Sequence, residues 1–190
     1  MTSRCSQKIF TYTFCFYIFI GFYNTKAADQ TWKQNREVMP AVTAEQSDKS
    51  KQDAFHVLDG YQVEKLFDVP RDALGSWVSL TSDPQGRLYA CDQQDKGLVR
   101  ITPATLDGST ETVVEKVPAA LSGAQGLLWA FDSLYAVCNG GGFHGLFRIT
   151  DSDGDSLPDH VEKLHDIAAG GEHGAHNILL SPDGKKLFII

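Results

Sequence analysis

The sequence has few cysteines and, after its first 27 residues, no long apolar run. Of its four cysteines, Cys5 and Cys15 belong to the N-terminal stretch, so two remain beyond it, Cys91 and Cys138. Two cysteines cannot form the disulfide framework of a small secreted domain. We expect two buried free thiols, with a bridge between them as the alternative. No segment beyond residue 27 is apolar over the roughly 20 residues that a membrane-spanning helix needs.

The one long apolar run lies close to the N-terminus. Met1–Lys8 carries two basic residues and no acidic one, and Ile9–Tyr23 is uncharged and rich in aromatic and β-branched residues. Thr25 and Ala27 are the small residues that a signal peptidase requires for cleavage after Ala27. This order predicts a secretory signal peptide over residues 1–27, and therefore a secreted or periplasmic protein. An uncleaved membrane anchor is the alternative, but the run is short for a span of roughly 20 residues.

Basic residues are scarce in the rest of the chain. Without residues 1–27 the sequence has 14 basic and 24 acidic side chains, a formal net charge of −10. Nucleic-acid phosphates would repel such a protein, so we expect no nucleic-acid partner. Carboxylates suit hard cations instead. Residues 28–54 are polar, mixed in charge and without periodicity, which predicts a disordered extension before the folded domain.

The folded domain, residues 55–190, contains an internal repeat. Gly97–Thr102 reads GLVRIT and Gly145–Thr150 reads GLFRIT, 48 residues later. Two related pieces, GRLYACD and DSLYAVCN, precede these copies, and a third such piece, SPDGKKLFII, occupies Ser181–Ile190. All of them are short β-branched or aromatic runs between Gly, Pro and Asp, which is the pattern of strands and turns.

A repeat of about 40–50 residues with about four short strands per unit predicts an all-β fold, and specifically a β-propeller. A β-sandwich with coincidental similarity is the alternative, which the paired copies disfavour. The sequence contains two full blades and the start of a third, so this propeller is incomplete, because a closed one needs at least about four. We therefore expect the chain to be the N-terminal piece of a longer protein.

An acidic loop follows the second copy of the repeat. Residues 151–162 read DSDGDSLPDHVE, which places carboxylates at positions 1, 3, 5, 9 and 12 and the backbone carbonyl of Leu157 at position 7. This is the ligand spacing of a twelve-residue calcium loop. The predicted ligands of a structural Ca²⁺ are Asp151, Asp153, Asp155, Asp159 and Glu162. The alternative is an acidic, solvated turn between two strands.

A segment with two histidines precedes the third unit. Gly170–Asp183 reads GGEHGAHNILLSPD, which places His173 and His176 just before the innermost strand of that unit. In a propeller the innermost strands surround a central channel, where ligands bind. A histidine placed there can act as a general base near neutral pH.

This segment resembles a known family. His173, followed eight residues later by Ser181-Pro182-Asp183-Gly184 and an apolar strand, is similar to the H-x-x-G-x-L-x-x-G-P-D-G pattern of the soluble glucose/sorbosone dehydrogenases. The longer segment EHGAHNILLSPDGKKLFII, which follows an acidic loop, resembles the membrane-bound dehydrogenase domains of planctomycete-type bacteria. The resemblance covers roughly residues 55–190.

The resemblance implies a calcium-containing propeller that oxidises a sugar or aldehyde with pyrroloquinoline quinone (PQQ). His173 would be the catalytic base that takes the hydroxyl proton, and His176 would contact the cofactor. A cytochrome c is the implied electron acceptor. Haem c would belong to this protein only through a C-terminal extension, because the sequence contains no C-x-x-C-H motif. The alternative function is a non-catalytic propeller that binds a carbohydrate or protein partner.

Overall fold

The structure, a computed structural model, describes residues 56, 58–61, 63–105, 107–167 and 174–190. The predicted signal peptide, the predicted extension and His173 lie outside the described residues. Within the described part, no helix is long and apolar enough to cross a membrane. The described residues cover nearly all of the predicted repeat region.

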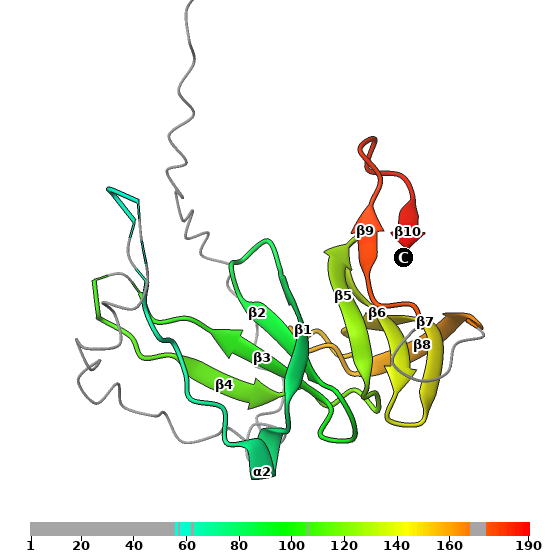
Figure 1. The fold of residues 1–190 in the computed structure, drawn as a ribbon, viewed down its shortest axis with the longest axis horizontal. Coiled ribbons are helices and arrows are strands. Elements are labelled where there is room, and N and C mark those ends of the chain that lie inside the picture. The colour runs from blue at the N-terminus through cyan, green and yellow to red at the C-terminus, as the bar shows by residue number, and fades with distance from the viewer. Residues whose placement is uncertain (1–55, 57, 62, 106, 168–173) are drawn as a thin grey trace, which may run out of the picture. The chain divides into compact units, whose positions relative to one another are not determined.

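In this part of the chain, ten strands form three antiparallel sheets (Figure 1). The first sheet has the order β1-β2-β3-β4 and the second the order β5-β6-β7-β8, so each strand pairs with its neighbour in the sequence. The third sheet is the hairpin β9-β10. The elements are α2 (Arg71–Leu74), β1 (Trp77–Ser82), β2 (Leu88–Asp92), β3 (Leu98–Thr102), β4 (Val113–Lys116), β5 (Ala124–Ala130), β6 (Ser133–Gly140), β7 (Phe143–Thr150), β8 (His160–His165), β9 (Ile178–Leu180) and β10 (Leu187–Ile189).

The predicted all-β fold is confirmed, and the repeat copies occupy equivalent places in it. GLVRIT contains β3 and GLFRIT ends β7, and each is the third strand of a four-stranded sheet. The acidic loop connects β7 to β8, and SPDGKKLFII forms the turn and second strand of the β9-β10 hairpin. The described sheets do not close into a ring, so the propeller and its blade count remain predictions.

The same three side-chain types face one another across both four-stranded sheets. In the first sheet the register partners on β2, β3 and β4 are Tyr89, Arg100 and Glu115. In the second sheet the partners on β6, β7 and β8 are Tyr135, Arg148 and Glu162. The arginine and glutamate form an ion pair in each sheet, 2.7 Å and buried in the first, 2.6 Å and exposed in the second. The repeat therefore extends to the side-chain contacts between strands.

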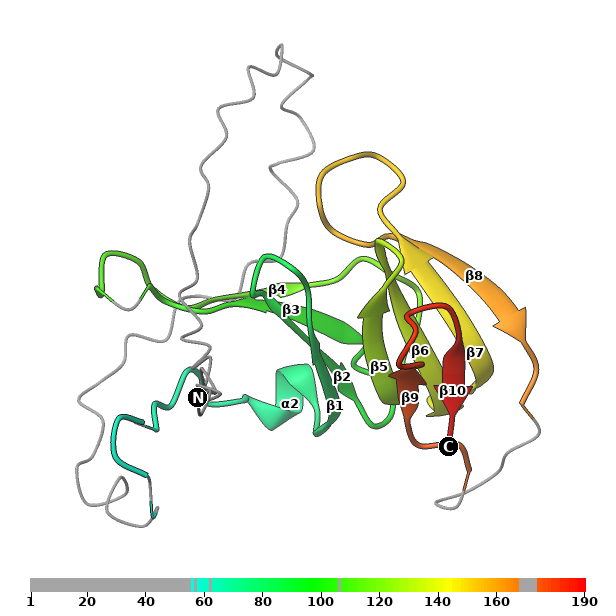
Figure 2. The same ribbon diagram turned by 90° about the horizontal axis from the view of Figure 1, so that it is seen from above.

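The sheets pack against one another through their first strands. β5 contacts β1 on one side and β9 on the other (Figure 1, Figure 2). Ser79 Oγ on β1 donates a hydrogen bond of 2.6 Å to the carbonyl oxygen of Ala124 on β5. On the other side, a Cβ atom at Gly126 would lie 2.9 Å from Asn177 Cα, so the glycine allows the segment before β9 to approach β5 closely. The first strands of the three sheets thus lie side by side.

Cys91 and Cys138 lie in the core between the first two sheets. Both are buried free thiols, as expected from the sequence. Trp129 packs against the same cluster and stacks on Tyr89, with ring centroids 5.4 Å apart. Burial raises the pKa of Cys91 to about 12, so this thiol stays protonated and serves packing rather than nucleophilic chemistry.

Candidate ligand pocket and aspartate loop

One end of the three sheets collects turns and strand starts that bear polar side chains. In a set of antiparallel neighbours, the start of the first strand and the turn between the second and third strands lie at the same end. Gln93 and Gln94 lie in the β2–β3 turn, Gly141 in the β6–β7 turn, and Gln125 near the start of β5. His176 lies two residues before β9. The topology therefore gathers residues that are far apart in the sequence.

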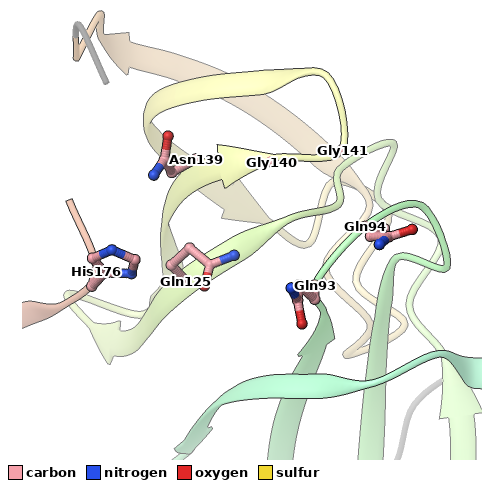
Figure 3. A pocket seen from close by; sticks show the side chains of 7 residues that line it. All are labelled: Gln93, Gln94, Gln125, Asn139, Gly140, Gly141 and His176. Carbon is pink, nitrogen blue, oxygen red and sulfur yellow. The ribbon is translucent and has the colours of Figure 1, made fainter. Parts of the chain in front are cut away.

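These residues line a cavity of about 280 Å³ (Figure 3). The lining consists of four carboxamide side chains, one imidazole and two glycines: Gln93, Gln94, Gln125, Asn139, His176, Gly140 and Gly141. Figure 3 shows a row that runs, from left to right, through His176, Gln125, Gln93 and Gln94. Among the described residues, the lining contains no carboxylate, ammonium or guanidinium group. The cavity is therefore polar without carrying a fixed charge.

Asp92 holds the β2–β3 turn, and with it Gln94, in place. Its carboxylate accepts hydrogen bonds from the backbone N–H groups of Ser76 (2.6 Å), Gln94 (3.0 Å) and Lys96 (3.0 Å). Burial acts to raise the pKa of Asp92, but the backbone donors together outweigh it and leave the pKa below its usual value. A charged carboxylate thus ties the β2–β3 turn to the segment before β1.

Glycines allow the backbone around the cavity to pack without side chains in between. A Cβ atom at Gly141 would lie 2.1 Å from the backbone oxygen of Gln94, and one at Gly123 would lie 2.2 Å from the carbonyl carbon of Gly140. Both glycines have positive φ angles, 59° and 68°. The N–H of Asn139 also donates to the carbonyl oxygen of Gly123 at 3.2 Å. A side chain larger than hydrogen therefore does not fit at Gly123 or Gly141.

The backbone at His176 is held by the β9-β10 hairpin. The N–H groups of His176 and Asn177 donate to the carbonyl oxygen of Ile190 at 2.7 and 3.2 Å, and the Ile190 N–H donates back to Asn177 at 3.1 Å. The structure thus places His176, the predicted cofactor contact, in the wall of the cavity, and its role there remains a prediction. His173, the predicted catalytic base, lies outside the described residues.

The described lining does not fit pyrroloquinoline quinone. This cofactor carries several carboxylates, which proteins bind best with arginine or lysine. The described lining of the cavity contains neither residue. Its volume of about 280 Å³ is also just below the roughly 300–1,000 Å³ that is usual for sites of this kind. The quinone therefore has no counter-charge in this cavity among the described residues.

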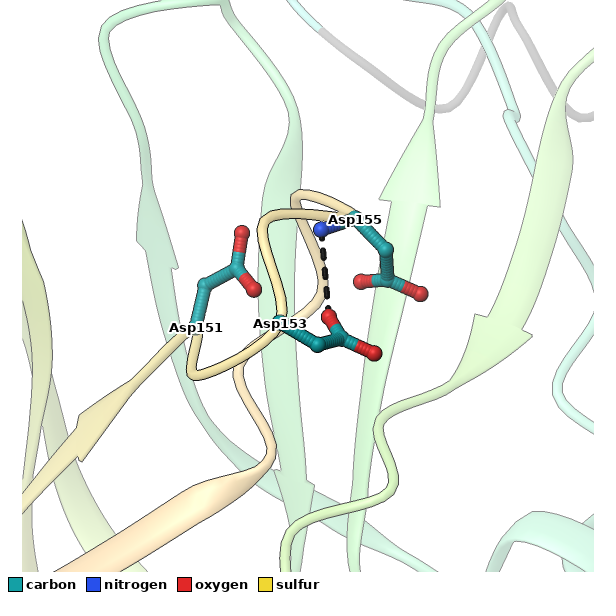
Figure 4. A group of neighbouring side chains, drawn as sticks. All are labelled: Asp151, Asp153 and Asp155. Atoms are coloured by element: carbon teal, nitrogen blue, oxygen red, sulfur yellow. Dashed lines mark hydrogen bonds between the residues drawn. The ribbon is translucent and has the colours of Figure 1, made fainter. Parts of the chain in front are cut away.

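The loop between β7 and β8 gathers three of the five carboxylates predicted to bind the metal. One carboxylate oxygen from each of Asp151, Asp153 and Asp155 lies within 4.8 Å of the others (Figure 4). Asp151 accepts hydrogen bonds from the N–H groups of Gly154 and Ser156, both at 2.7 Å, and Asp153 accepts one from Asp155 at 3.1 Å. These contacts hold three like charges close together.

Asp159 and Glu162, the other two predicted ligands, have partners outside this group. The carboxylate of Asp159 accepts hydrogen bonds from the N–H and hydroxyl of Ser152 at 2.8 and 2.7 Å, which lowers the pKa of Asp159. Glu162 lies on β8 and pairs with Arg148 at 2.6 Å. This is the place that Glu115 takes in the first sheet, so the repeat itself explains a glutamate at this position.

The loop is also anchored on the first sheet. Arg100 Nη1 on β3 donates to the carbonyl oxygen of Ser156 at 2.7 Å, while Nε and Nη2 of the same guanidinium donate to Glu115 at 3.1 and 2.7 Å. Leu157, whose carbonyl is the sixth predicted ligand, is 3% exposed and belongs to the core cluster between the sheets. The loop is therefore a contact between the two sheets as well as a candidate metal site.

The grouped carboxylates of Asp151, Asp153 and Asp155 fit a hard cation. Ca²⁺ takes about six to eight oxygen ligands at about 2.3–2.6 Å. Carboxylate oxygens that already accept one backbone N–H retain a lone pair for a metal. Without a cation, three carboxylates at this spacing repel one another. These three residues are the ones that would hold Ca²⁺, and calcium binding itself remains a prediction.

No family model, no curated protein and no solved structure matches this chain. The resemblance to the glucose/sorbosone dehydrogenases therefore rests on the sequence motifs alone and remains a prediction. The geometry of the cavity and of the acidic loop carries the argument for function.

Sequence reasoning did not identify Gln93, Gln94 and Gln125 as site residues. A signal was available, because the two glutamines of the turn directly follow the GRLYACD segment, and Gln125 is the second residue of the first strand of the next unit. The repeat thus predicts that they share one end of the sheets. A glutamine in a turn is not by itself indicative of a binding site, so the cavity can be identified only from the structure.

Proposed function

We propose that this protein is an exported, calcium-stabilised β-propeller whose carboxamide-lined cavity binds an uncharged, polyhydroxylated small molecule, that is, a sugar. The observation that carries the proposal is the set of four carboxamides around one cavity without a fixed charge. A carboxamide both donates and accepts hydrogen bonds, as a sugar hydroxyl does. An anionic ligand would call for arginine or lysine in the wall instead.

The fold and the acidic loop support the other parts of this proposal. Two equivalent four-stranded sheets and a third hairpin, packed through their first strands, are the arrangement that neighbouring propeller blades have. A calcium ion at Asp151, Asp153 and Asp155 would neutralise the loop that Arg100 attaches to the first sheet. Ion and arginine would thus stabilise the same contact between sheets.

Calorimetric titration of the full chain with glucose, galactose, mannose and their dimers tests sugar binding. Gln125→Ala should weaken the binding of any sugar that binds by on the order of tenfold, because two hydrogen bonds of ordinary net strength correspond to about that factor. Gln85→Ala is the matched control, since Gln85 lies in the β1–β2 turn at the other end of the first sheet. Equal affinities for the two variants, or no heat from any sugar, would refute the proposal.

Oxidation of the bound sugar or aldehyde, with a cytochrome c as electron acceptor, is the second candidate, and His176 in the cavity wall favours it. Because the described lining offers the quinone no counter-charge, this candidate requires that residues outside the described lining hold PQQ. A positioned imidazole removes a hydroxyl proton efficiently near neutral pH. In a dye-reduction assay with PQQ and Ca²⁺ supplied, His173→Asn should lower turnover by about 10²–10⁴. His176→Asn should lower it less, and His165→Asn on β8 should have no effect. Absence of quinone-dependent oxidation in the parent protein overturns this candidate and leaves sugar binding untouched.

A further inference from the structure

A second cavity, of about 250 Å³, adjoins the first. Gln93 and Gln94 line both cavities. The rest of the second lining comes from α2, the segment before β1 and the β2–β3 turn, and consists of Arg71, Gly75, Ser76, Asp92, Asp95 and Lys96. Because two side chains are common to both linings, the two cavities meet at Gln93 and Gln94.

The charges of the second cavity balance. The lining contains two basic residues, Arg71 and Lys96, and two acidic residues, Asp92 and Asp95. The carboxylate of Asp92 is engaged by backbone N–H groups, whereas the other three residues are exposed at the surface. Lys96 Nζ lies 3.7 Å from Asp95 Oδ1, so this cation is paired within the wall, and the two cations and two carboxylates leave no net charge to attract an anionic ligand. The second cavity therefore suits the same uncharged, hydroxyl-rich chemistry as the first.

We infer that the two cavities form one groove, from His176 past the two glutamines to Arg71, and that this groove takes a chain of at least two sugar units, with one unit in each cavity and Gln93 and Gln94 at the junction. This inference rests on the proposed function and adds the class of ligand, an oligosaccharide rather than a monosaccharide. Volume supports it, because 280 and 250 Å³ are each below the roughly 300–1,000 Å³ of usual ligand sites, and the two together lie within that range.

The test is a titration of the full chain with sugars of increasing length: glucose, galactose and mannose, each as monomer, linked dimer and linked trimer. The dimer or trimer should bind on the order of tenfold more tightly than its monomer, because a second unit adds about two or more hydrogen bonds. Arg71→Ala should abolish most of this gain. Lys65→Ala, which removes an exposed positive charge outside both cavities, should retain it.

Two outcomes separate this inference from the proposed function. Equal affinity for monomer and trimer, with no effect of Arg71→Ala, overturns the two-unit groove while the first cavity still binds a sugar. Failure of sugars of every length to bind overturns the proposed function, and the groove inference with it.

Discussion

Arg100 on β3 of the first sheet donates a hydrogen bond of 2.7 Å to the carbonyl oxygen of Ser156, in the β7–β8 loop of the second sheet. The same guanidinium pairs with Glu115 on β4. One buried side chain thus connects two strands of the first sheet with the candidate calcium loop of the second. The repeat places the exposed pair Arg148–Glu162 at the equivalent position, which makes the two pairs directly comparable.

Arg100→Met should lower the free energy of unfolding by about 3–5 kcal/mol, because Glu115 would keep a buried charge without this counter-charge. Arg100→Met combined with Glu115→Leu should recover much of the loss. Arg148→Met is the control and should cost less than about 1 kcal/mol, because its pair is exposed to solvent. Urea unfolding measures all three variants. Similar losses for Arg100→Met and Arg148→Met would contradict the assigned role.

Gly123→Ala should destabilise the protein more than Gly184→Ala does. Both glycines have nearly the same positive φ, 68° and 69°, so the backbone strain of an alanine is matched. At Gly123 the new Cβ would lie 2.2 Å from the backbone of Gly140, whereas nothing lies within 4 Å at Gly184. The difference between the two unfolding free energies should be about 1–3 kcal/mol, the usual cost of overpacking. A difference near zero would show that the segment before β5 is not packed this tightly against the end of β6.

Asp92→Asn should destabilise the protein by about 1.5–3 kcal/mol at pH 7, because three backbone N–H groups would lose a charged acceptor. The pKa of Asp92 is lower in the folded state than in the unfolded chain. Its contribution is therefore fully present above an unfolded pKa of about 3.9 and is lost as the pH falls through the folded pKa. Urea unfolding at several pH values should show the two proteins converging at acid pH. A constant difference at all pH values would argue against this carboxylate as the source.

Calcium should raise the melting temperature of the protein, and a chelator should reverse the rise. At a calcium concentration about 100 times the dissociation constant, binding adds about 2.7 kcal/mol to the stability of the folded state. Asp153→Asn should reduce the rise, because it removes one of the three grouped charges. Asp107→Asn, in the β3–β4 loop of the first sheet, should leave the rise intact. A melting temperature insensitive to both calcium and chelator would mean that the acidic loop is a turn and nothing more.

The strand pattern of this protein is readable from its sequence because the repeat carries it. GLVRIT and GLFRIT define the third strand of each four-stranded sheet, and the repeated segments upstream of them contain the second strands. The antiparallel pairing of the second strand with the third can therefore be predicted from the sequence. The cross-strand partners were not foreseen. The spacing of the acidic loop predicts Glu162 as a metal ligand, whereas the register of the repeat, read from Glu115, pairs it with an arginine.

The cavity is the part that sequence reasoning could not supply. Its lining depends on how closely the first strands of adjacent sheets approach, and that distance is set by contacts such as Gly126 against Asn177. Such contacts join segments from different units, and no sequence motif in either segment predicts them. His176 was selected for its chemistry, and the fold adds the carboxamides that surround it.

If the carboxamide cavity binds an uncharged sugar, the sugar should perturb the side-chain amides that line the cavity. The most direct measurement follows the side-chain amide signals of the isotope-labelled full chain by nuclear magnetic resonance while a neutral sugar trimer is titrated. The signals of Gln93, Gln94, Gln125 and Asn139 should shift together with one dissociation constant, while that of Gln85 stays in place. A sugar that shifts Gln85 as much as these four, or that shifts none of them, would show that this cavity does not bind sugar.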